Sequence, residues 1–128
     1  MSIAREKLYW IHIWKLCGLI VSDRTLPPVC KTIGWLLLNH YNLKTGKCFP
    51  SHHLLKEESN YKLRQVKNAT KRLNKKYIPI AKKGKTGLAN EYQPAFELVA
   101  NDPDVVQFCA TISAKTQSKK GYMSAPQT

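Results

Sequence analysis

Apolar residues repeat every three or four positions between residues 28 and 41, and this spacing is typical of a helix with one buried face. Val29, Ile33 and Leu37 mark that face. Pro28 suits the first turn of a helix, because the N–H that proline lacks would have no intrahelical partner there. The pattern therefore predicts a well-buried helix over about 28–41.

Two further helices are predicted on either side of a tight turn at Asn60. Ser51 can cap the first, over about 51–59, because its hydroxyl can accept a hydrogen bond from a free N–H of the first turn. Asparagine tolerates the left-handed backbone conformation that a tight turn needs. The second helix, over about 61–76, buries one apolar face and presents basic side chains to solvent. A short helix, a tight turn and a longer helix form a helix-turn-helix arrangement.

The N-terminal pattern fits two kinds of element. Ile11 and Ile13 alternate with aromatic and polar residues, which predicts a strand over 9–14. Ile13 and Cys17, together with the two neighbouring tryptophans, also fit helical spacing. A short helical turn is further expected at 16–20.

Residues 77–81 and 90–98 flank a turn that is rich in lysine and glycine. This arrangement predicts a two-stranded hairpin over 77–98. Pro79 and Pro94 imply that both are edge strands, because proline cannot donate to a central ladder.

The C-terminal part begins with an aspartate–proline pair and an apolar stripe, which predict a short helix over about 103–114. Residues 115–128 have few apolar side chains and are expected to be mobile. The fold class is therefore α+β. We expect a three-helix core with a two- to three-stranded β-hairpin region in a domain over 1–100, followed by the helix and tail over 101–128.

Positive charge is concentrated in one quarter of the chain. The protein has 128 residues and a formal net charge of +13. Between Asn60 and Asn90 there are ten lysines and arginines and no aspartate or glutamate. Such a one-sided field attracts polyanions, which makes nucleic acid the first candidate partner.

Other chemistry has little support in the sequence. The four cysteines show no CxxC spacing, so we interpret them as reduced thiols of a cytoplasmic protein, with a Cys17–Cys30 disulfide left open. Cys48, His52 and His53 do not make a four-ligand metal set, because adjacent histidines on a helix point in different directions. Charged residues interrupt the apolar N-terminal run, which disfavours a signal peptide or membrane span. We expect no enzymatic activity, no metal and no cofactor.

Leu26 to Leu98 resembles the winged helix-turn-helix domains of bacterial, plasmid and phage replication initiators and small mobile-element regulators. The matching features are an apolar helix, a Gly-Lys-Cys-Phe-Pro-Ser motif, three apolar positions at family spacing and a glycine-containing wing. They are Leu26, Thr32 to Leu38, Gly46 to Ser51, Leu55, Val66, Leu73 and the wing before Glu91 and Tyr92. The resemblance implies a DNA-binding domain in which an N-terminal strand often joins the wing sheet.

Residues along the basic helix and the wing are the candidate DNA contacts. Arg64 can bridge O6 and N7 of guanine, and Gln65 or Asn68 can pair with adenine in the major groove. Helix N-termini favour anions, so a phosphate is expected near Ser51. The full set is Ser51, Tyr61, Lys62, Arg64, Gln65, Asn68, Lys71, Arg72, Lys75, Lys82, Lys83, Lys85 and Thr86.

The sequence thus predicts a sequence-specific, nucleoid-associated protein that binds double-stranded DNA as a transcription regulator or replication-origin factor. A homodimer through the N-terminal aromatic segment or the C-terminal helix is expected, with Trp10, Trp14 and Trp35 as core or subunit contacts. The alternative is a protein-interaction module whose basic face binds an acidic or nucleoprotein partner. Binding of RNA or single strands is a weaker third hypothesis, because no aromatic platform is evident.

Overall fold

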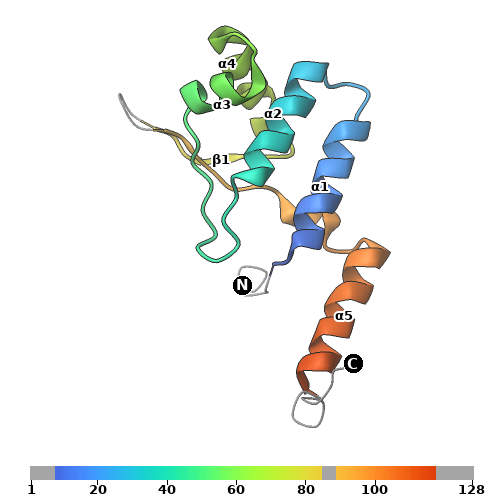
Figure 1. The fold of residues 1–128 in the computed structure, drawn as a ribbon. Coiled ribbons are helices and arrows are strands. Elements are labelled where there is room, and N and C mark those ends of the chain that lie inside the picture. The colour runs from blue at the N-terminus through green and yellow to red at the C-terminus, as the bar shows by residue number, and fades with distance from the viewer. Residues whose placement is uncertain (1–7, 85–88, 118–128) are drawn as a thin grey trace.

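The computed structural model describes residues 8–84 and 89–117, and in this part of the chain the fold is α+β, with five α-helices and one small antiparallel sheet (Figure 1). The elements are α1 (Trp10–Ser22), α2 (Pro28–Asn39), α3 (His52–Ser59), α4 (Leu63–Asn74), β1 (Ile80–Lys82), β2 (Glu91–Tyr92), the 3-10 helix η2 (Phe96–Val99) and α5 (Pro103–Gln117). The predicted helices at 28–41, 51–59 and 61–76 are present as α2, α3 and α4, with slightly shorter bounds.

The core lies where α1, α2 and α4 meet. Leu16 and Ile20 of α1 pack with Ile33 of α2 and Leu73 of α4, and all four side chains are buried. Gly34 allows close approach of α2 to its neighbours, because a Cβ there would stand 3.1 Å from the Cγ2 atom of Ile20. This core fixes the position of α4 in the fold.

The prediction of a strand at 9–14 is wrong, because these residues begin the helix α1. Buried positions follow at Ile13, Leu16, Cys17 and Ile20, which is helical spacing that continues well beyond residue 14. The tryptophans are not core residues either. Trp10, Trp14 and Trp35 expose 63%, 68% and 51% of their surface.

The sequence correctly predicted the cap of α3 at Ser51 and the turn at Asn60, whereas the role of Gln65 at the start of α4 was not predicted. The Ser51 hydroxyl accepts a hydrogen bond of 3.0 Å from the N–H of Leu54, which caps α3. Asn60 ends α3 in the left-handed conformation, with φ at 67°. The side chain of Gln65 then accepts a 3.0 Å hydrogen bond from the N–H of Lys62, which satisfies a donor at the start of α4.

The hairpin is shorter than predicted, and the segment before α3 contacts it through a hydrogen bond. β1 and β2 pair in antiparallel fashion, with Ile80 opposite Tyr92. The N–H of Tyr92 donates a 2.7 Å hydrogen bond to the carbonyl oxygen of Cys48, so the segment before α3 lies along β2. The second strand does not reach residue 98 as expected, because the buried Pro94 follows β2 and the chain then turns into η2.

The C-terminal helix α5 begins at Pro103, where the sequence predicted it, and projects away from the other helices (Figure 1). Val105 is buried, and Lys15 of α1 bonds the carboxylate of Asp104 at 2.6 Å. The rings of Tyr9 and Phe108 meet edge to face, with centroids 5.4 Å apart. These contacts join only the first part of α5 to α1.

The cysteines of the fold are free thiols, so Cys17 and Cys30 are not bonded to each other. Burial raises the pKa of Cys17 to about 11 and that of Cys48 to about 12, which keeps both protonated at neutral pH. Within the ranges described above, no helix combines the length and the apolar character needed to cross a bilayer.

Candidate nucleic-acid interface

Helix α4 presents a polar and cationic face directly opposite its buried one. Val66, Ala69, Thr70 and Leu73 form the buried side. At 100° per residue, the side chains that point away from this side come from four exposed positions. They are Arg64, Asn68, Lys71 and Lys75.

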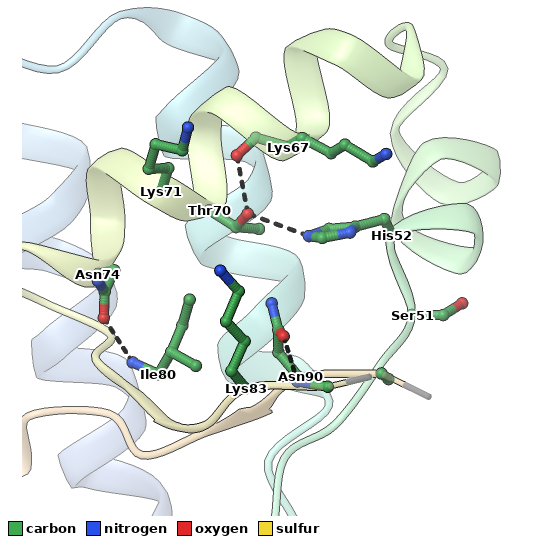
Figure 2. Close-up of a pocket in the computed structure, with 11 residues that line it drawn as sticks. Ser51, His52, Lys67, Thr70, Lys71, Asn74, Ile80, Lys83 and Asn90 are labelled. Carbon is green, nitrogen blue, oxygen red and sulfur yellow. Dashed lines mark hydrogen bonds between the residues drawn. The ribbon is translucent and has the colours of Figure 1, made fainter. Parts of the chain in front are cut away.

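One flank of α4 borders a groove that α3 and the hairpin complete. The groove has a volume of about 840 Å³, and its residues come from three parts of the chain (Figure 2). They are Ser51 and His52 at the start of α3, Lys67, Thr70, Lys71 and Asn74 on α4, and Ile80, Lys83, Gly84, Ala89 and Asn90 on the hairpin. The groove therefore lies between α3, α4 and the hairpin.

A short hydrogen-bond chain joins α3 to α4 inside this groove. The buried Thr70 hydroxyl donates to the carbonyl oxygen of Lys67 at 3.0 Å and lies 3.2 Å from Nε2 of His52. A hydroxyl that donates to this carbonyl accepts from His52 in the tautomer that carries the ring proton on Nε2. Burial, and then the charge of Lys67, lower the pKa of His52, so the imidazole is neutral at pH 7.

Two asparagines fix the hairpin on the other side of the groove. The Asn74 side-chain oxygen accepts a 2.6 Å hydrogen bond from the N–H of Ile80, which sets the start of β1 against the end of α4. The Asn90 side-chain oxygen accepts a 2.7 Å bond from the N–H of Gly84, which joins the two arms of the hairpin. Lys83 extends from the hairpin toward α4 (Figure 2).

The positive charge around the groove has no compensating acid. In the part of the chain that the structure describes, the ion pairs involve Lys15, Lys56, His40 and His53, and none involves a lysine or arginine of α4 or the hairpin. Three ammonium groups, those of Lys67, Lys71 and Lys83, belong to the groove lining. A site with several unpaired cations and no carboxylate favours an anionic ligand.

The predicted contact residues fall into three groups. Exposed side chains on the outer face of α4 or along the groove and hairpin are Ser51, Lys62, Arg64, Asn68, Lys71, Lys75, Lys82 and Lys83. Tyr61 is half-buried against the core, Gln65 bonds its own helix start, and Arg72 donates a 2.8 Å hydrogen bond to the carbonyl oxygen of Thr25. Lys85 and Thr86 lie outside the described residues.

Arg72 is part of a contact that fixes the end of α4 to the turn between α1 and α2. In that turn Asp23 accepts hydrogen bonds from the Thr25 hydroxyl and the Tyr77 hydroxyl, both at 2.6 Å. These bonds, with that of Thr25 first, lower the pKa of Asp23 to about 2. Burial and the Asp23 carboxylate raise the pKa of Tyr77 to about 12. The turn therefore supports α4 from the side opposite the groove.

Sequence reasoning missed five polar residues of the groove, namely His52, Lys67, Thr70, Asn74 and Asn90. Lys67 and Asn74 are seven positions apart on one flank of α4, which helical spacing alone can reveal. His52 and Asn90 come from other elements, and no spacing rule links them to α4. Only the packing of α3 and the hairpin around α4 brings them together.

Comparison of the chain with known proteins found no matching family model, no matching curated protein and no matching solved structure. Among the described residues, no group of three or more histidine, cysteine, aspartate or glutamate side chains is placed to hold a metal ion.

Proposed function

We propose that the protein is a winged helix-turn-helix protein that binds double-stranded DNA in a sequence-specific manner. It acts as a transcription regulator or as a factor at the replication origin of a mobile element, and both roles use the same surface. The order of elements supports this proposal, because α2, α3 and α4 are followed directly by the hairpin of β1 and β2. The hydrogen bond from Tyr92 to Cys48 adds a third extended segment beside the hairpin, in the position of the first strand of a winged helix.

The observation that carries the proposal is the exposed, acid-free face of α4 beside a cationic groove. An α-helix with its side chains is about 10–12 Å across, and the major groove of B-DNA is about 12 Å wide. With α4 in the major groove, Arg64 and Asn68 would face the base edges. Lys71 and Lys75 follow on the same face, where they would meet the phosphate backbone.

The hairpin supplies the second part of the interface. Lys83 extends toward α4 across the groove that Lys67 and Lys71 also line. A phosphate backbone passing between α4 and the hairpin would be contacted from both sides. Such contacts position the protein without reading sequence, whereas the α4 face reads the bases.

Gln65 and Arg72 are better suited to positioning α4 than to reading bases. Gln65 already accepts a hydrogen bond at the helix start, and Arg72 already donates one to the turn before α2. Base contacts by either side chain would require these bonds to break. We therefore assign the reading of bases to Arg64 and Asn68.

Selection of binding sites from random duplexes tests this function. The full-length chain should enrich a defined motif. Arg64→Ala should loosen the preference at one position, because a bidentate contact to guanine discriminates by about 1–3 kcal/mol. Lys83→Ala should weaken all sites by similar factors, and Lys44→Ala, in the exposed loop before α3, should change neither. Failure to enrich any motif would refute sequence-specific binding, and equal effects of Arg64→Ala and Lys83→Ala would refute the division of roles.

A further inference from the structure

Helix α1 carries an exposed apolar stripe in addition to its buried face, and we call the side with this stripe the outer face of α1; the half-buried Lys15 instead bonds Asp104 of α5. Trp10, Trp14 and Val21 expose 63%, 68% and 52% of their surface. Gly18 and Leu19 are exposed between them, and Ser22 is the one exposed polar residue of the helix. A surface helix normally carries charged or polar residues on its solvent side, whereas a helix that is apolar all round is covered on all sides. The outer face of α1 is therefore built to be covered.

The shape of this face has two unequal halves. Trp10, Trp14, Gly18 and Val21 follow one another at spacings of four, four and three, so they form one stripe along the helix. Its N-terminal half carries two large indole rings, whereas its C-terminal half carries only a glycine and a valine. Among the described residues nothing lies within 4 Å of a Cβ placed on Gly18, so the surface is low there, and we call this low part the hollow. Glycine weakens a helix interior, and no contact among the described residues requires it at that position.

Little positive charge lies in α1 and in the segment that runs from β2 into α5. Residues 92–114 contain no lysine or arginine, and residues 8–23 contain only Lys15. These two segments hold four acidic residues in a chain whose net charge is +13. In the described part of the chain, they also supply seven of the eleven large apolar side chains that are exposed. Two copies of a strongly basic chain can approach each other with least repulsion on this side.

We propose that a second copy of this chain covers the outer face of α1. The two α1 helices pack in antiparallel orientation and cross near Gly18, so that Trp14 of each copy fills the hollow between Gly18 and Val21 of the other. A two-fold interface requires a surface that is complementary to itself, and one stripe with a bulky half and a hollow half meets this requirement. Large aromatic side chains that enter a partner's hollow are the usual anchors of such interfaces.

This dimer leaves the basic groove accessible. Helix α1 lies on one side of α2, and α3 lies on the other (Figure 1). The groove is lined by α3, α4 and the hairpin and contains no residue of α1. Both copies can therefore present an α4 face at the same time. The proposal concerns the free protein and holds whether or not the chain binds DNA.

The proposal can be tested by sedimentation velocity of the full-length chain, without DNA and over a wide range of concentrations. The wild type should sediment as a dimer that dissociates on dilution. Trp14→Glu should weaken the dimer by about 30-fold or more, as expected for an interface anchor. Phe49→Glu is the matched control: this ring is also exposed, at 58%, but lies in the loop before α3, so the dimer should be unchanged.

The variant Gly18→Arg distinguishes loss of the dimer from loss of the fold. A side chain at this position meets open space within one copy and replaces a poor helix former, so the far-ultraviolet circular dichroism and thermal midpoint should be retained or improved. The same side chain would fill the hollow that Trp14 of the second copy needs, so the dimer should be lost. A wild type that stays monomeric at every concentration would overturn the proposal and leave the face to a different protein. A dimer that survives Trp14→Glu and a folded Gly18→Arg, or one that Phe49→Glu weakens equally, would also overturn it.

Discussion

The double variant Lys71→Gln and Lys83→Gln tests whether the groove contacts the DNA backbone. The two ammonium groups come from α4 and the hairpin, both residues are exposed, and both line the groove. If about six cations of α4 and the hairpin meet phosphates, log affinity falls against log salt with a slope of about −5.4. Loss of two contacts leaves a slope of about −3.6. Glutamine removes the charge but keeps a polar side chain of nearly the same length, so the fold should be retained.

The change is large enough to measure by fluorescence anisotropy of a labelled duplex. Between about 50 and 200 mM salt, the wild type should lose affinity by about 2,000-fold and the double variant by about 150-fold. Lys44→Gln is the matched control, because this lysine is exposed in the loop before α3 and outside the groove. If the double variant and the control give lines parallel to the wild type, the groove does not hold phosphate and the reasoning fails.

Three further predictions concern the supports of α4. Asn60→Ala should lower the free energy of unfolding by about 1 kcal/mol in denaturant titrations, because alanine strains the left-handed backbone, whereas Asn60→Gly should change it little. Ser51→Ala should cost about 1 kcal/mol through the lost cap of α3, and Ser51→Gly only a few tenths, in the same assay. Hydrogen bonds from Thr25 and then Tyr77 lower the pKa of Asp23 to about 2. The stability that Asp23 contributes is therefore present above about pH 4 and lost between about pH 4 and 2. Asp23→Asn should lower the thermal midpoint at pH 7 and flatten its decline in that acid range. If the thermal midpoints of the wild type and of Asp23→Asn fall equally steeply in that acid range, a contribution from Asp23 is excluded.

The helices around the turn were predictable because local signals agree there. Ser51 is both a good cap and the residue before the first helical turn, and Asn60 is the only non-glycine residue with positive φ in the described chain. Val66 and Leu73 repeat with helical spacing, and the structure buries both. Capping, turn chemistry and periodicity are local properties, so sequence is enough to locate them.

The N-terminal element could not be assigned because α1 is apolar on both faces. Ile11 and Ile13 alternate with their neighbours as in a strand, and the one polar residue between Trp10 and Trp14, His12, is buried and marks no solvent face. A helix without a polar face gives no single period, so strand and helix fit equally well over six residues. The buried series at Ile13, Leu16, Cys17 and Ile20 decides the matter only when the full helix is considered.

Half of the candidate site depends on tertiary packing. Lysines were correctly expected on the solvent side of α4, but Arg72 is held by Thr25, 47 positions earlier in the chain, through a hydrogen bond. His52 enters the groove because Thr70 pairs with it across two helices. Local sequence spacing does not reveal contacts between residues this far apart. For this reason the sequence analysis included Arg72 among the DNA contacts and left His52 out.

Lysine footprinting in the presence and absence of a selected duplex most directly tests the claim that α4 and the hairpin form the DNA-binding surface. Reductive methylation followed by mass spectrometry reports the accessibility of each lysine separately. If this surface binds DNA, the duplex should strongly protect Lys67, Lys71 and Lys83 and leave the reactivity of Lys44 and Lys15 unchanged. Equal protection of all five lysines, or protection of Lys44 without Lys71 and Lys83, would contradict this claim.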